Sequence, residues 1–155
     1  MFKSATALMV SAALVFTFQA NAGKEASATA KAKASVKKSI KIEAVSDLNF
    51  GEGYTGDDAL TFSADAGQGA EFAVGGEAGA TFNITLPASV IMKTGDGLGA
   101  DKQIVVDNFN SNPAGSGALD GAGAKALRVG ARRASIANTQ VSGSYEADFV
   151  VTVAY

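Results

Sequence analysis

The side chains that could carry chemistry in this sequence are carboxylates in glycine-rich stretches. TGDGLGAD (94–101) offers Asp96 and Asp101, and hard cations such as calcium take carboxylate and carbonyl oxygens as ligands. The acidic spacing does not fit an EF-hand or a glycine-rich nonapeptide repeat, so a β-hairpin loop is the favoured interpretation. Asp57 and Asp58 are adjacent, whereas glycan hydrolysis needs two carboxylates that face one cleft.

The chain contains no cysteine, no histidine and no tryptophan. Their absence removes most metal sites and the usual pairs of nucleophile and base. We therefore expect no catalytic site, no metal and no cofactor. Because no disulfide can form, burial and hydrogen bonding must hold the fold together.

The N-terminus has the pattern of a secretory signal peptide. Lys3 precedes an apolar run at 5–18, and Ala20-Asn21-Ala22 matches an A-x-A cleavage site. We assign residues 1–22 to this leader and expect an exported protein. A retained N-terminal anchor is the alternative.

The charge is unevenly distributed along the rest of the chain. Residues 23–43 hold six lysines and two glutamates, a net charge of +4, whereas residues 44–155 hold six basic and thirteen acidic residues, a net charge of −7. A basic segment of this kind is either a solvated tail or a segment attracted to an acidic surface, such as another copy of the protein. Nucleic acid is excluded as a partner because the exported chain is acidic overall.

The body of the chain reads as short β-strands separated by glycine-rich turns. Apolar residues alternate in AEFAVGG (70–76) and ATFNITLPA (80–88), and further strands are expected at 89–93, 103–109 and 126–136. In SYEADFVVTVAY (144–155), six residues share one face: Tyr145, Ala147, Phe149, Val151, Val153 and Tyr155. Strands at such intervals predict an all-β, antiparallel β-sandwich domain at 39–155.

A second alternating pattern, ASATAKAKASVKKSIKIEA (26–44), is too long for one strand of a small domain. The natural division is at Lys37-Lys38. Ser39–Val45 then forms the first strand, with Ile40 and Ile42 facing the core, and 23–38 is a projecting, strand-like basic tail. Its small and apolar face consists of Ala28, Ala30, Ala32, Ala34 and Val36, together with Ala26.

A strand without a partner in its own domain either stays disordered or pairs with the edge of another chain. In donated strands, the backbone supplies hydrogen bonds and alternate side chains fill pockets. Head-to-tail repetition of this contact gives an open filament. Three alternatives stay open for the tail: a donated strand, a disordered linker, and a helix or a strand paired with its own body.

Four stretches resemble a bacterial family known as domain of unknown function 4402: DLNFG (47–51), GATFNITLPAS (79–89), LRVGARR (127–133) and QVSGSYEADFVVTVAY (140–155). Its members look like exported immunoglobulin-like β-domains, and the ending is similar to that of chaperone–usher pilins. The resemblance implies a fimbrial subunit that passes through the periplasm to the cell surface, with an assembly chaperone and an outer-membrane usher as partners. It also implies that the donor strand lies within 26–36. The chaperone-facing and core-facing set would then be Tyr145, Phe149, Val151, Val153 and Tyr155.

The sequence thus predicts a structural subunit that polymerises with other copies of itself through its N-terminal tail. The alternative is a secreted adhesin or binding module that acts as a monomer. In that case the tail is a tether, and exposed aromatic residues on the loops, such as Tyr54, would contact the ligand.

Overall fold

The computed structural model describes residues 25–155, so the leader predicted at 1–22 lies outside the described residues. The described chain divides into two units, residues 25–35 and residues 36–155. In the first unit, residues 25–35 form no helix or strand, and all of their side chains are exposed. Within residues 25–155, no helix combines the length and the apolar character that crossing a membrane requires.

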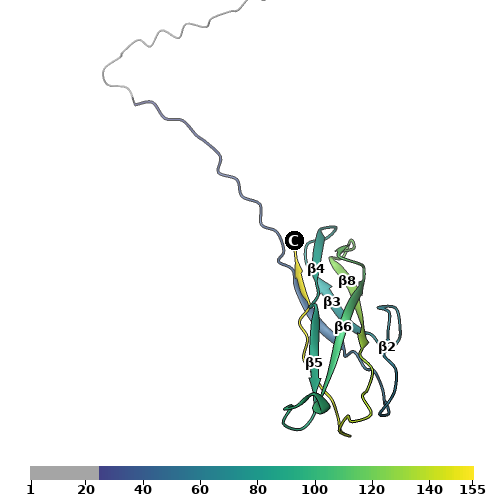
Figure 1. Ribbon diagram of the computed structural model, residues 1–155. Coiled ribbons are helices and arrows are strands. Elements are labelled where there is room, and N and C mark those ends of the chain that lie inside the picture. The colour runs from purple at the N-terminus through teal and green to yellow at the C-terminus, as the bar shows by residue number, and fades with distance from the viewer. Residues whose placement is uncertain (1–24) are drawn as a thin grey trace, which may run out of the picture. The chain divides into compact units, whose positions relative to one another are not determined.

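The larger sheet of the second unit has six antiparallel strands, five of them in the order β1-β3-β8-β6-β5, while β2 pairs with β8 (Figure 1). The strands are β1 (Lys41–Ser46), β2 (Leu60–Thr61), β3 (Ala70–Gly75), β5 (Ser89–Lys93), β6 (Gln103–Asn112) and β8 (Ala124–Arg133). A short 3-10 helix, η1 (Ala100–Lys102), precedes β6. The sheet therefore ends at β1 on one side and at β5 on the other.

The smaller sheet has the order β7-β4-β9, with β4 in the centre. Its strands are β7 (Ser116–Ala118), β4 (Thr81–Thr85) and β9 (Thr152–Ala154). All pairings in both sheets are antiparallel. The chain is thus an all-β, antiparallel sandwich, which confirms the predicted fold class.

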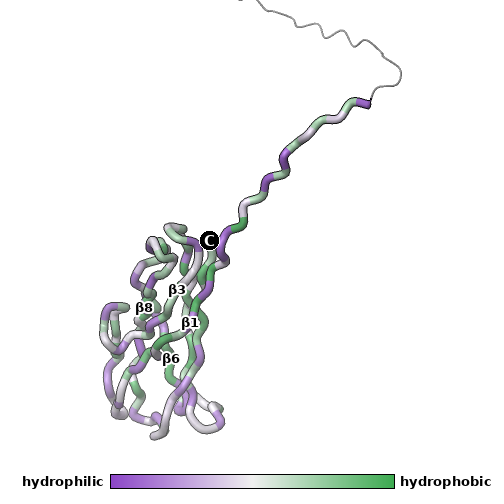
Figure 2. The backbone as a smooth tube through the Cα atoms, turned by 180° about the vertical axis from the view of Figure 1, so that it is seen from behind, coloured by the Kyte–Doolittle hydropathy of each residue, from purple (hydrophilic) through white to green (hydrophobic). Residues whose placement is uncertain are grey.

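The alternating patterns place the core between the two sheets. On β3, Ala70 and Val74 are buried whereas Ala73 is exposed, and on β4 Phe82 is buried between exposed neighbours. The buried cluster consists of Ala70, Val74, Phe82, Leu119, Leu127, Val129 and Val151. In Figure 2, hydrophobic stretches follow β1 and β6.

The first strand is close to its predicted position. It is observed at Lys41–Ser46 rather than at Ser39–Val45, and Ile40 and Ile42 pack against the core cluster as expected. Its ladder with β3 is regular up to Ala44 and shifts by a bulge before Ser46. Beyond the bulge Ser46 still pairs with Glu71, and the backbone N–H of Asn49 donates to the carbonyl oxygen of Gln68 at 3.0 Å.

The last segment differs from its prediction as one long strand. Only Thr152–Ala154 pairs in a sheet, with β4, and an isolated bridge joins Glu146 to Lys93 on β5. The segment leaves the edge of the larger sheet and joins the smaller one, so its middle has no neighbouring strand. Its alternation persists nevertheless, because Val151 is buried and Phe149 is half-buried while Val150 is exposed.

Candidate functional site

A wide groove of about 1190 Å³ runs between two walls of the second unit. One wall is formed by residues 44–55 and the other by residues 140–149. The floor includes Ala70 and Phe72 of β3, Met92 of β5 and Ile104 of β6. Its volume is slightly above the roughly 300–1000 Å³ of common small-molecule pockets.

Aromatic rings meet at the bottom of this groove. The ring centroid of Phe149 lies 6.1 Å from that of Phe72 in an edge-to-face arrangement and 5.3 Å from that of Phe109. Both distances are in the range of favourable aromatic pairs. Phe149 thus joins the wall at 140–149 to the inner face of the larger sheet.

The wall at 140–149 presents free backbone groups to the groove. Within residues 25–155, no backbone group of residues 147–151 takes part in a hydrogen bond, whereas Glu146 exchanges two with Lys93, of 2.9 and 3.1 Å. Neighbouring residues of an extended chain direct their backbone groups to opposite sides. Because those of Glu146 face β5, we expect those of Ala147 and Phe149 to face the groove wherever the chain is extended.

The opposite wall also has a free edge. β1 pairs with β3 along one side only, and although it lies near β9 the two strands are not paired. Ala44 lies on the same side of the extended chain as the half-buried Ile40 and Ile42. It is nevertheless exposed, and it lines the groove. Ala44 is uncovered because no strand fills the space between the two walls.

The C-terminal tyrosine fixes the beginning of the folded body. The hydroxyl of Tyr155 donates to the carbonyl oxygen of Lys38 at 3.1 Å and accepts from the backbone N–H of Glu77 at 2.7 Å. The backbone N–H of Lys38 donates in turn to Glu77 Oε2 at 2.9 Å. A Cβ on Gly76 would collide with the Tyr155 hydroxyl, so glycine is required there. These contacts hold the root of the tail beside the end of β9.

The residues of the last segment that we predicted as one chaperone-facing and core-facing set lie in different parts of the structure. Phe149 and Tyr145 line the groove, whereas Val151 belongs to the buried core cluster and Val153 packs against it. Tyr145 lies at the far end of the groove, where its hydroxyl donates to the carbonyl oxygen of Val141 at 2.6 Å. In the tail, Ala28, Ala30, Ala32, Ala34 and Val36 are exposed and outside any helix or strand. Their predicted role as donor residues stays a prediction.

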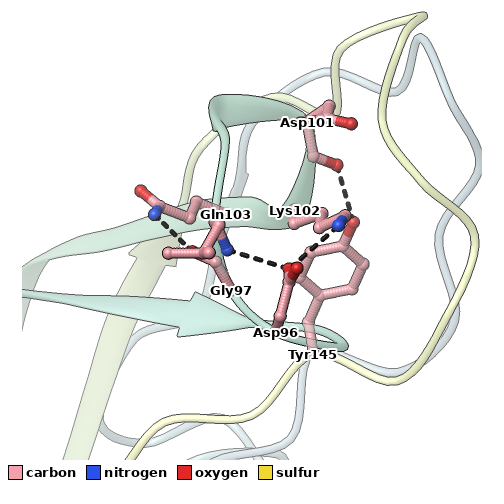
Figure 3. Close-up of polar contacts among 7 residues, drawn as sticks. Asp96, Gly97, Asp101, Lys102, Gln103 and Tyr145 are labelled. Carbon is pink, nitrogen blue, oxygen red and sulfur yellow. Dashed lines mark hydrogen bonds and ion pairs between the residues drawn. The ribbon is translucent and has the colours of Figure 1, made fainter.

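The loop at 94–101 is a hairpin connection between β5 and β6. The ammonium group of Lys102 lies 2.9 Å from Asp96 Oδ1, which also accepts from the backbone N–H of Leu98 (Figure 3). These bonds, first that from Lys102, lower the pKa of Asp96 below its ordinary value of 3.8. Among the described residues, no three of the types His, Cys, Asp and Glu are grouped as metal ligands would be.

Four carboxylates on the groove walls were not singled out by the sequence: Asp47, Glu52, Glu146 and Asp148. None of them forms an ion pair within residues 25–155. Arg133 is the basic residue of the lining, and its guanidinium donates to the carbonyl oxygens of Asp58 and Ala134. The lining of the groove is therefore acidic. In the sequence, the feature that pointed to acidic residues on the body was the net charge of −7 over residues 44–155.

The chain was compared with models of known families. The sequence model of a family described as "Domain of unknown function (DUF4402)" matches residues 51–155. The chain belongs to this family. The DUF4402 match covers β2 to β9 and the wall at 140–149, whereas β1 precedes it. No curated protein and no solved structure matches the chain.

Proposed function

We propose that this protein is an exported structural subunit of a bacterial surface filament, and that it polymerises by strand donation. Residues 26–36 of one copy fill the groove of the next copy and pair with the free edges of its two walls. The proposal is carried by one observation: two unpaired edges flank an apolar floor at the place where a sandwich would hold a further strand. Such a groove is an incomplete fold that an added strand completes.

The tail is longer than the groove wall that it would follow, so it can span the groove. At about 3.3 Å per residue, the seven residues 44–50 span roughly 23 Å, and the eleven residues 26–36 span roughly 36 Å. Alternate small side chains of the tail would then face Phe72 and Phe149, which already occupy much of the floor. Alanine fits such a shallow space, and each buried methyl group adds only about 0.8 kcal/mol. Hydrogen bonds along both edges, at about 0.5–1.5 kcal/mol each, would supply most of the binding energy.

The position of the tail root suits a filament. Lys38 is held beside Tyr155 at the β9 end of the sandwich, so each subunit offers its donor segment from that end. A subunit that receives one tail and offers another forms a heterologous contact, which repeats without closing. From the resemblance of the ending sequence to chaperone–usher pilins, we further propose that an assembly chaperone protects the groove before polymerisation.

The test compares the chain beginning at Gly23 with a tail-less chain beginning at Lys38, by size-exclusion chromatography and negative-stain electron microscopy. The longer chain is expected to form polymers that resist SDS without boiling, and the tail-less chain to stay monomeric. A third sample mixes the two. Because a tail-less subunit can accept a strand but cannot donate one, it is expected to cap the polymers and shorten them in proportion to its fraction.

The control for folding is the circular dichroism spectrum and melting temperature of each chain. If both chains are monomers with the same melting temperature, and the mixture shows no capping, strand donation is wrong. The monomeric binding module is then the better interpretation, and Tyr54, which is 76% exposed, marks the loop to probe for a ligand.

A further inference from the structure

The proposed donor segment has an apolar face that cannot by itself set its position in the groove. Ala28, Ala30, Ala32 and Ala34 are identical, so a slip of two residues replaces one methyl group by another. Register in a strand is specified where distinct side chains must reach distinct places, and it is weak where they are equivalent. If strand donation is correct, some other feature must fix the register.

Two exposed carboxylates provide such a feature on the groove wall. Glu146 and Asp148 are two residues apart, so they share the solvent-facing side of the segment whose other side carries Tyr145 and Phe149. Neither forms an ion pair within residues 25–155. On the tail, Lys31 and Lys33 are also two residues apart and lie on the side opposite to the alanines.

We infer that these four charges set the register of the donated strand, which runs antiparallel to residues 145–151 with Lys31 opposite Asp148 and Lys33 opposite Glu146. This inference rests on the proposed function. The same register puts Ala30 opposite Phe149 on the groove side. It also puts Ala32 opposite Ala147, so each large wall residue faces a small donor residue.

The backbone geometry favours contact between these charges. Glu146 directs its backbone groups to Lys93 of β5. In an extended chain Asp148, two residues further on, takes the same orientation. Both residues would therefore form non-hydrogen-bonded pairs with the donor, in which Cα atoms are about 4.5 Å apart and side chains are closer than in the other type of pair. Opposite charges placed directly across in this way attract each other, and like charges repel.

Charge alone would allow a parallel strand, with Lys31 opposite Glu146 and Lys33 opposite Asp148. In that direction Lys38 of the donor would lie opposite Val153 of the acceptor. The body of the donor would then collide with the place where Tyr155 holds the acceptor's own Lys38. In the antiparallel direction the donor's body lies beyond Tyr145, at the opposite end of the groove, and the tail root of the acceptor stays free.

The experiment uses cysteine pairs, which is possible because the chain has no cysteine of its own. Val150→Cys is combined in turn with Thr29→Cys, Ser27→Cys or Ser35→Cys in the chain beginning at Gly23. Thr29 lies opposite Val150 in the proposed register, Ser27 does so after a slip of two residues, and Ser35 does so in the parallel strand. Disulfides require Cα atoms about 4.4–6.8 Å apart, a distance that direct partners meet and diagonal ones exceed.

The expected result is a ladder on non-reducing gels after boiling that is strongest for the pair at 29 and 150. A ladder strongest for 35 and 150 overturns the direction. A ladder strongest for 27 and 150, or equal for all three pairs, overturns the register. Each of these outcomes leaves strand donation intact. Chains that form neither polymers nor ladders would overturn strand donation itself, and the register with it.

A charge exchange tests the cause of the register. Reversal of both lysines (Lys31→Glu with Lys33→Glu) is expected to weaken subunit association by about 2- to 30-fold, from about 0.2–1 kcal/mol for each cross-strand pair. Reversal of Glu146 and Asp148 to lysine restores association in that background. The matched control, Lys24→Glu with Lys37→Glu, changes the tail charge equally but lies outside the proposed donor strand at 26–36, so it is expected to have a smaller effect and no rescue. Equal loss in the control and no rescue would show that only the net charge matters.

Discussion

Replacement of Phe149 by alanine tests the packing of the groove. Its ring contacts those of Phe72 and Phe109 but leaves part of its surface in the groove. Complete burial of such a side chain is worth about 1.5–3 kcal/mol, and each aromatic pair adds about 0.5–1.5 kcal/mol. Because burial is incomplete, we expect Phe149→Ala to lower the free energy of unfolding of the tail-less subunit by about 2–3 kcal/mol.

The same substitution should cost more when the groove is filled. A donated strand would cover the remaining surface of Phe149, so the loss should approach the roughly 3–5 kcal/mol of a fully buried phenylalanine. The assay is urea unfolding followed by circular dichroism, since the chain has no tryptophan, with and without a saturating peptide of residues 23–38. Val150→Ala is the matched control, because Val150 is 73% exposed and should change stability by less than about 0.5 kcal/mol.

Two results would refute this reasoning. If Phe149→Ala costs no more than Val150→Ala, the aromatic cluster does not stabilise the wall at 140–149. If it costs the same with and without the peptide, while the peptide binds, the occupant does not cover Phe149. The peptide would then bind at another place.

Further predictions concern the sandwich itself. Leu127→Ala, at a fully buried position, should cost about 2–5 kcal/mol in urea unfolding, and retained stability would place the core elsewhere. Gly130→Ala should cost about 1–3 kcal/mol, because its Cβ would collide with the backbone of residues 62–64, whereas Gly67→Ala has free space and should be neutral. Tyr155→Phe removes both bonds of the hydroxyl at the tail root, so we expect a loss of about 1 kcal/mol and faster hydrogen exchange at Glu77. The pKa of Asp120 lies below its ordinary value of 3.8, because the backbone N–H groups of Ala124 and Ala122 donate to its carboxylate. The stability that these bonds add to the folded state is therefore present above that value, and it is lost as the pH falls through the lower pKa of Asp120 in the folded state. Asp120→Asn should therefore flatten the acid limb of a stability–pH profile, and an unchanged limb would contradict this.

The sequence alone was sufficient for the fold class and for the orientation of many side chains. Alternation identified the buried faces of β3 and β4, because a side chain's face in a strand follows from its position in the chain. It also identified the inward face of the last segment, where Val151 is buried and Val150 is exposed. The charge contrast between tail and body was visible in composition, although it did not show which carboxylates line the groove.

Only the tertiary structure decided which edges stay unpaired. The pattern of SYEADFVVTVAY cannot show that Glu146 pairs with β5 while Thr152–Ala154 pairs with β4, because both partners are distant in sequence. The wall at 44–55 was equally hidden, since the pairing of β1 with β3 shifts at a bulge after Ala44 and no periodic pattern follows it. Periodicity records which face of a strand meets apolar surroundings, whereas pairing depends on which backbone lies beside it. The groove exists because two such edges meet over Phe72 and Phe149 without a strand between them.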